Sequence, residues 1–67
     1  MSTHVAFKPR QEAVLKLLCR GCENRQVAAV AHMSESNVER VRKQLMLITR
    51  SNNAVQLGVW AAKRGIV

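Results

Sequence analysis

The chain has 67 residues, 48% of them hydrophobic, which is enough for one small folded domain and disfavours wholesale disorder. Eleven Lys and Arg against four Glu give a net charge of +7 at pH 7, which favours a polyanionic partner. With one Phe, one Trp and no Tyr, the chain lacks the aromatic anchors of a membrane-surface helix and the rings that stack single-stranded bases, so double-stranded DNA is the expected partner.

Turn-forming residues divide the chain into a flexible N-terminal arm, residues 1–7, and a single all-α domain, residues 8–67. Pro9 suits the first turn of a helix, and Gly21 suits the left-handed position after a helix end. Period-2 alternation of useful length is absent, so no strand is expected. The pattern predicts four helices, at residues 9–19, 24–32, 35 to 48 or 49, and about 54–64.

The second and third expected helices have the pattern of a helix-turn-helix. Ala28 supplies the small side chain needed where two helices cross closely. The connection His32-Met33-Ser34 is short enough to force the bend, and His32 tolerates a positive φ better than a β-branched residue. Ser34 is a good N-cap for the third helix. The apolar residues expected to face inward are Val27, Ala31, Met33, Val38 and Val41.

The third expected helix has one apolar and one polar side. On a helical wheel Val38, Val41, Leu45 and Ile48 share the first side. The other carries Ser36, Asn37, Glu39, Arg40, Lys43 and Gln44. Arg40 and Lys43 can donate to guanine, Asn37 or Gln44 can pair with adenine, and Glu39 can accept from cytosine. Such a helix can enter a major groove, although a polar helix face is more often simply solvated.

The fourth expected helix is apolar on more than one side. Val55, Val59 and Trp60 flank a core stripe of Leu57 and Ala61. Two interpretations follow: Trp60 completes a small core, or Val59 and Trp60 lie near the twofold axis of a dimer. The dimer is favoured, because it adds stability to a small domain and gives a footprint of two half-sites.

Several segments together resemble the DNA-binding domain of LuxR/GerE-type regulators, which also forms the output domain of NarL/FixJ-type response regulators. The resemblance covers residues 7–67 in register and without gaps. The segments that carry it are Pro9-Arg10, Val14-Leu15-Lys16-Leu17-Leu18, Gly21, Asn24-Arg25-Gln26-Val27-Ala28, Met33-Ser34-Glu35-Ser36-Asn37-Val38 and Ala61-Ala62-Lys63-Arg64-Gly65-Ile66-Val67.

The resemblance implies a four-helix domain whose third helix reads DNA and whose fourth helix dimerises. The base-contacting residues would be Ser36, Glu39, Arg40 and Lys43, and the phosphate-contacting residues Arg25, Ser34, Asn37 and Gln44. The dimer interface would comprise Val55, Gln56, Val59, Trp60 and Lys63. The chain departs from the family at Glu39, where a basic residue is usual. A carboxylate there is repelled by phosphates unless it pairs, and Lys43, four residues on, is within reach of an i,i+4 bridge from Glu39.

Cys19 and Cys22 form a Cys-x-x-Cys pair, which can be structural, a redox pair or half of a zinc site. A structural zinc site needs four ligands, and only His4 and His32 remain, at unsuitable spacing. A thioredoxin-like pair needs a βαβ context, which is absent. Structural cysteines are therefore favoured, and no metal site is expected.

The sequence favours neither membrane insertion, export nor catalysis. The longest unbroken apolar run, residues 27–31, is far shorter than the about 20 residues that span a bilayer. A secretion signal is not visible, so a cytoplasmic location is expected. Because no nucleophile, base and orienting group can be combined, we expect no enzyme activity, cofactor or small-molecule ligand.

Together these patterns predict a stand-alone, dimeric, sequence-specific transcriptional regulator of the bacterial helix-turn-helix type. RNA polymerase and a larger regulator of the same family are further candidate partners. Two alternatives stay open. One is a small interaction protein that pairs with a larger LuxR-type regulator and modulates it. The other is a nonspecific, nucleoid-type binder of DNA, or a binder of RNA.

Overall fold

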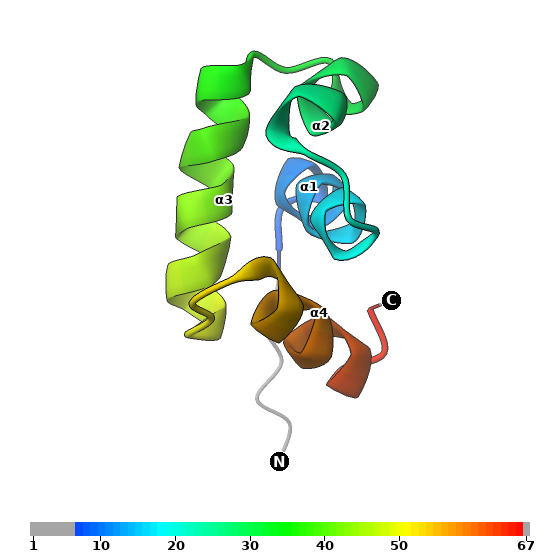
Figure 1. Cartoon of the computed structure of the whole chain (residues 1–67), viewed down its shortest axis with the longest axis vertical. Helices are drawn as coiled ribbons and strands as arrows, with labels where there is room; N and C mark the ends of the chain where they lie inside the picture. The colour runs from blue at the N-terminus through cyan, green and yellow to red at the C-terminus, as the bar shows by residue number, and fades with distance from the viewer. Residues whose placement is uncertain (1–6, 67) are drawn as a thin grey trace.

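A computed structural model describes residues 7–66, which form four α-helices and no strand. The helices are α1 (Pro9–Cys19), α2 (Asn24–Ala31), α3 (Glu35–Thr49) and α4 (Ala54–Lys63) (Figure 1). The expected all-α class is confirmed, and the helix bounds differ from the expected ones only where α2 and α4 end one residue earlier. Within this part of the chain, no helix combines the length and apolarity needed to cross a membrane.

The first two helices begin without a side-chain N-cap and are anchored by a glutamine instead. The backbone N–H of Lys8 donates to Gln11 Oε1 at 3.0 Å, and that of Glu23 donates to Gln26 Oε1 at 2.9 Å. Each glutamine therefore reaches back to the residue that precedes its helix, which is half of a capping box. The poor N-cap that Lys8 provides for α1 is compensated in this way.

The turn between α2 and α3 has the geometry expected from the sequence. His32 adopts the left-handed conformation, with φ 56° and ψ 46°. The N–H of Met33 then donates back to the carbonyl of Ala28 at 2.9 Å, which closes the end of α2. Ser34 lies two residues after His32, and its Oγ accepts from the N–H of Asn37 at 3.1 Å and caps α3. These contacts fix the direction in which α3 leaves α2.

The connection between α3 and α4 is tied down by buried hydroxyl groups. Thr49 Oγ1 donates to the carbonyl of Leu45 at 2.7 Å and lies 2.8 Å from Ser51 Oγ, and both hydroxyl residues are buried. Arg50 between them is left-handed, with φ 55°. Asn53 Oδ1 accepts from the N–H of Gln56 at 2.9 Å and caps α4.

The helical wheel is wrong about Ile48, which it placed on the buried side of α3. Ile48 is 45% exposed, and Thr49 is buried in its place. Thr49 stands one turn beyond Leu45, and its hydroxyl is satisfied by the Leu45 carbonyl, so burial leaves no polar group unpaired. Ile48 lies on the flank of α3 that the neighbouring helices leave open.

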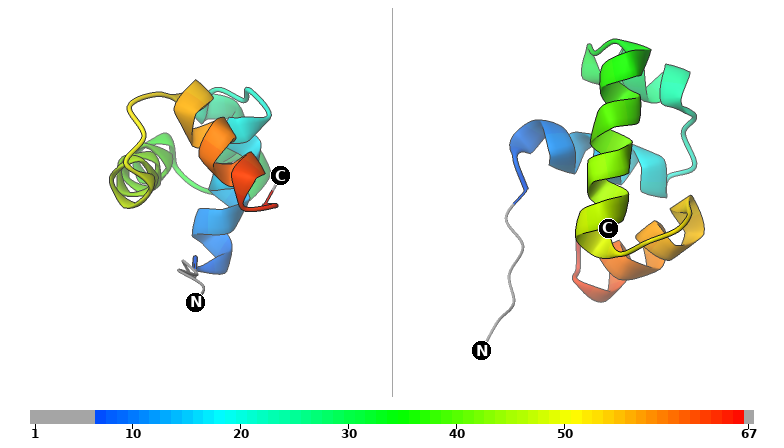
Figure 2. Two further views of the ribbon diagram at one scale, coloured as in Figure 1. Left: turned by 90° about the horizontal axis from the view of Figure 1, so that it is seen from below. Right: turned by 90° about the vertical axis from the view of Figure 1, so that its left-hand side faces the viewer.

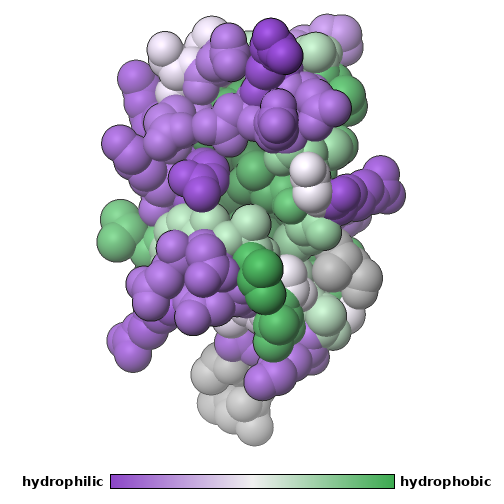
Figure 3. All heavy atoms as spheres, viewed as in Figure 1, coloured by the Kyte–Doolittle hydropathy of each residue, from purple (hydrophilic) through white to green (hydrophobic). Residues whose placement is uncertain are grey.

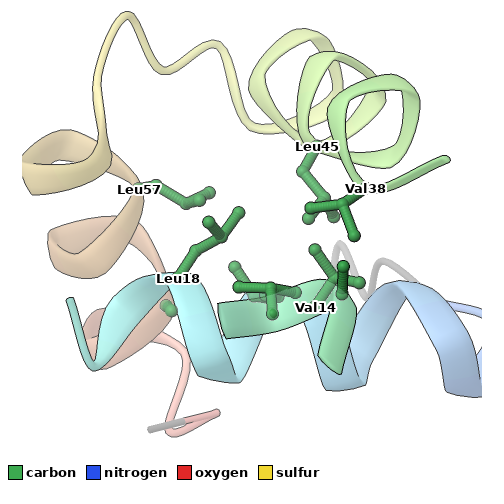
Figure 4. Close-up of a cluster of buried hydrophobic side chains, with 9 residues drawn as sticks. Val14, Leu18, Val38, Leu45 and Leu57 are labelled. Atoms are coloured by element: carbon green, nitrogen blue, oxygen red, sulfur yellow. The ribbon is translucent and has the colours of Figure 1, made fainter. Parts of the chain in front are cut away.

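All four helices contribute to one hydrophobic core. Figure 4 shows side chains of α1, α3 and α4 pointing toward one another, among them Val14, Leu18, Val38, Leu45 and Leu57. The complete set of buried apolar residues is Val14, Leu15, Leu18, Val27, Ala28, Val38, Leu45, Leu57 and Ala61. Met33 and Val41, also expected to face inward, are half-buried and pack against this core. Helices α1 and α3 each contact all three of the other helices.

Phe7, assigned from the sequence to the N-terminal arm, packs against the core instead. Its ring meets the ring of Trp60 edge to face, with centroids 5.8 Å apart and planes at 78°. The guanidinium of Arg64 lies 4.4 Å from the centroid of Trp60. Phe7 therefore belongs to the packed domain, and the rest of the predicted arm, residues 1–6, lies outside the described residues.

Two leucines on α3 give a matched test of this packing. Leu45 is fully buried, whereas Leu47 is 79% exposed. We expect Leu45→Ala to lower the free energy of unfolding by about 2–5 kcal/mol, because it leaves a cavity in the core. Leu47→Ala should change it by less than about 0.5 kcal/mol. Urea unfolding followed by circular dichroism measures both; equal losses would contradict the placement of α3.

Candidate nucleic-acid interface

One side of α3 is free of the other helices along its length. Val38 and Leu45 anchor the opposite side in the core. In the right-hand view of Figure 2, α3 stands in front of the other helices, with none of the described segments covering it. Because the buried residues recur at helical spacing, the polar residues between them are presented outward as a continuous face.

Four residues on α3 were predicted to contact bases. Ser36, Arg40 and Lys43 are exposed, and Glu39 is half-buried. Their positions recur every three or four residues, so they form one stripe over two turns of α3. The structure places these four residues together on the free face of α3. Positively charged, negatively charged and neutral hydrogen-bonding side chains lie side by side there.

Glu39 has a different partner from the one expected. Its Oε2 accepts a hydrogen bond from Asn24 Nδ2 at 2.7 Å, so the predicted bridge from Glu39 to Lys43 is wrong. Within residues 7–66 the only ion pair joins Glu12 to Lys16, at 3.2 Å. The contact between Asn24 and Glu39 places the start of α2 against the second turn of α3. Lys43 is exposed and forms no ion pair among the described residues.

The residues predicted to contact phosphates flank this stripe. Arg25 is exposed and directly follows Asn24 in the chain. Because Asn24 is hydrogen-bonded to Glu39, Arg25 lies near the stripe. Ser34 is exposed, and although its oxygen caps α3, its hydroxyl hydrogen remains available as a donor. Asn37 is half-buried near the start of α3, and Gln44 is exposed in its third turn.

Figure 3 shows that the upper part of the side in view, over α2 and the start of α3, is mainly hydrophilic. Hydrophobic side chains form a band across the middle and lower centre, with a second hydrophilic cluster at the lower left. Sequence reasoning missed two polar residues of α2 and α3, Asn24 and the half-buried Arg42. Arg42 was detectable from its place on α3, but the contact of Asn24 with Glu39 spans 15 residues and follows no periodicity.

The predicted dimer surface on α4 is only partly free. Val55 is 76% and Val59 50% exposed, and both line an open, apolar hollow of about 460 Å³ between the end of α1 and α4. Its other lining residues are Leu18, Cys19, Gly21, Ala54, Gly58 and Ala62. Gln56 and Lys63 are exposed, but Gln56 Oε1 already accepts from the N–H of Asn52 at 2.7 Å.

Trp60, the remaining residue of that predicted surface, is largely occupied within its own chain. It is half-buried, packs against the core and contacts both Phe7 and Arg64. Of the two interpretations of Trp60, the structure favours the one in which it completes the core. The free apolar surface of α4 consists instead of the side that carries Val55 and Val59.

Two regulators are similar to almost the whole chain. It is 30% identical over 63 residues to a probable transcriptional regulator, ycf29, of Cyanophora paradoxa, which is 94% of this chain and 30% of that protein. It is 33% identical over 60 residues to the response regulator Rre1 of Synechocystis sp., which is 90% of this chain and 26% of that protein. The chain thus spans three-tenths or less of the curated relatives it matches. No protein-family model and no solved structure matches it.

The cysteines of the Cys-x-x-Cys pair are both half-buried and both carry free thiols. Burial raises the pKa of the Cys19 thiol, which lowers the fraction of nucleophilic thiolate. In the part of the chain that the structure describes, no three His, Cys or Glu side chains gather as a metal would require. The half-burial of Cys19 against the core and its raised thiol pKa favour a structural role for this residue.

The raised pKa of Cys19 can be tested by alkylation. In the Cys22→Ser variant, Cys19 should react with iodoacetamide more slowly at pH 8 in the folded protein than in urea. The midpoint of the pH–rate profile should also lie at a higher pH in the folded protein than in urea. The reason is that burial raises the thiol pKa, so the folded protein holds a smaller fraction of Cys19 as thiolate at a given pH. Mass spectrometry measures the rates; identical midpoints would contradict the effect of burial.

Proposed function

We propose that the chain is a LuxR/GerE-type helix-turn-helix domain that binds specific sequences of double-stranded DNA and regulates transcription. The observation that carries this proposal is the free polar face of α3, with Ser36, Arg40 and Lys43 exposed directly after a tight turn. The names of the two similar proteins, a transcriptional regulator and a response regulator, support a role in transcription. The order of the sequence motifs supports this particular family.

In the proposed complex α3 lies in the major groove, which is about 12 Å wide and admits one helix. The side chains of Arg40 and Lys43 reach the base edges and donate to guanine O6 and N7. Arg25 and Ser34 hold phosphates beside the groove, and these contacts fix the register of the helix on the duplex without reading sequence. The net charge of +7 draws the protein to DNA and makes binding depend on salt.

The apolar surface of α4 supports a dimer as the active form. Val55 and Val59 leave apolar surface open around the hollow of about 460 Å³. Pairing of two copies there removes this surface from water and presents two α3 helices to successive major-groove faces. The same surface also suits a second candidate function, in which the chain pairs with a larger regulator of related fold and modulates it.

Selection from a random duplex library tests the proposal. A palindromic consensus with two half-sites about 10 base pairs apart supports the dimeric, sequence-specific regulator. Enrichment of no sequence, with equal binding to all duplexes, would instead indicate a nonspecific binder. Binding that appears only after a larger family member is added would favour the second candidate function.

Replacing the cations of α3 should weaken specific binding. We expect Arg40→Ala and Lys43→Ala each to reduce affinity for the selected duplex by about 1–3 kcal/mol, and Arg40→Ala to relax the preference at one base pair. Arg10→Ala removes the same charge from an exposed position on α1 and is the matched control. Fluorescence anisotropy at several salt concentrations measures this; equal losses in all three variants would contradict base reading.

A charge on the exposed side of α4 should prevent self-association. Val59→Glu introduces a carboxylate beside the apolar hollow, and the proposed dimer would have to bury it unpaired. Val30→Glu makes the same change at a 61% exposed position on α2 and should leave the dimer intact. Analytical ultracentrifugation compares the two variants with the wild type. A wild type that sediments as a monomer at every concentration, or a dimer that survives Val59→Glu, would contradict this surface.

A further inference from the structure

A single hydrogen bond joins the first residue of α2 to the free face of α3. Asn24 Nδ2 donates to Glu39 Oε2 at 2.7 Å, in a partly buried position. A hydrogen bond to a carboxylate is stronger than one between neutral groups, and its length here lies within the range of that class. Partial burial further limits competition from water. Glu39 is therefore held at a defined place within the stripe that contains Ser36, Arg40 and Lys43.

The partner of Glu39 is neutral, so the contact leaves the negative charge of the carboxylate uncompensated. Among the described residues, no Lys or Arg forms an ion pair with Glu39. A carboxylate is repelled by phosphates, and it is also disfavoured opposite guanine, whose major-groove edge presents two acceptors. On a face that binds DNA, Glu39 can contribute favourably only opposite a donor.

The major groove offers two such donors, the amino groups of cytosine and adenine. Adenine places its N7 acceptor beside the N6 amino group, so an amide side chain, with one donor and one acceptor, fits it better than a carboxylate. Cytosine presents only its N4 amino group. With Oε2 engaged by Asn24, the carboxylate of Glu39 retains Oε1 as an acceptor for one such group.

We propose that Glu39 selects cytosine at one position of each half-site and that Asn24 is the positioning residue that holds its carboxylate. This inference rests on the proposed function and adds a specificity element to it. Glu39 also acts against guanine at that position, since two acceptors would then face a carboxylate. Asn24 limits the rotamers of Glu39, so the carboxylate is already oriented as a hydrogen-bond acceptor before DNA binds.

The experiment is library selection with the wild type and three variants, Glu39→Ala, Asn24→Ala and Asn52→Ala. Asn52 is exposed in the turn between α3 and α4, only its backbone N–H enters a hydrogen bond among the described residues, and its variant is the matched control. The wild type should enrich cytosine at one position per half-site. Glu39→Ala should lose that preference and keep all others, Asn24→Ala should reduce it several-fold, and Asn52→Ala should retain it. A purely structural role of Asn24 would instead weaken binding to all duplexes equally.

A base analogue tests the contact itself. The selected cytosine is replaced by 2-pyrimidinone, which lacks the 4-amino group, in an otherwise identical duplex. Wild-type affinity should fall about tenfold, within the range for losing a specific base contact. The Glu39→Ala protein should bind both duplexes equally, and thermal unfolding verifies that each variant is folded. A consensus unchanged by Glu39→Ala, or an analogue that weakens this variant as much as the wild type, would overturn the inference. A wild type that enriches no sequence would overturn the proposed function itself.

Discussion

The burial of Val38 and Leu45 in the core is the constraint on which the rest of the structure depends. These two side chains turn one side of α3 toward Val14 and Leu18 of α1, and they thereby decide which side of α3 faces outward (Figure 4). A helix of 15 residues cannot be stable alone in water unless its sequence strongly favours it, so tertiary packing keeps α3 folded. The packing that stabilises α3 therefore also determines that its polar residues face outward.

Much of this arrangement is predictable from the sequence, because it follows from local chemistry. The left-handed His32, the Ser34 cap and the Asn53 cap depend on residues within one turn of each other, and the helix bounds follow from them. The exposure of Arg40 and Lys43 follows from helical periodicity once the core side of α3 is assigned. Local rules thus account for the four helices and for most of the candidate interface.

The features that the sequence did not predict involve contacts between residues far apart in the chain or outside any periodic pattern. Asn24 and Glu39 belong to different helices, and nothing in either helix alone favours their contact over the helical pair of Glu39 with Lys43. Burial of Thr49 in place of Ile48 depends on where the chain leaves α3 for α4. Contact of Phe7 with Trp60 depends on how α4 lies across α1. Each requires the three-dimensional packing, which a one-dimensional pattern does not contain.

The pair of buried hydroxyls at the end of α3 has a consequence for how two copies of the fold would span an operator. Thr49 and Ser51 hold the backbone on either side of the left-handed Arg50 and thereby constrain the angle at which α4 leaves α3. In the proposed dimer joined through α4, this angle would set the distance between the two α3 helices. The spacing of two half-sites would then depend on hydroxyl groups buried inside each copy.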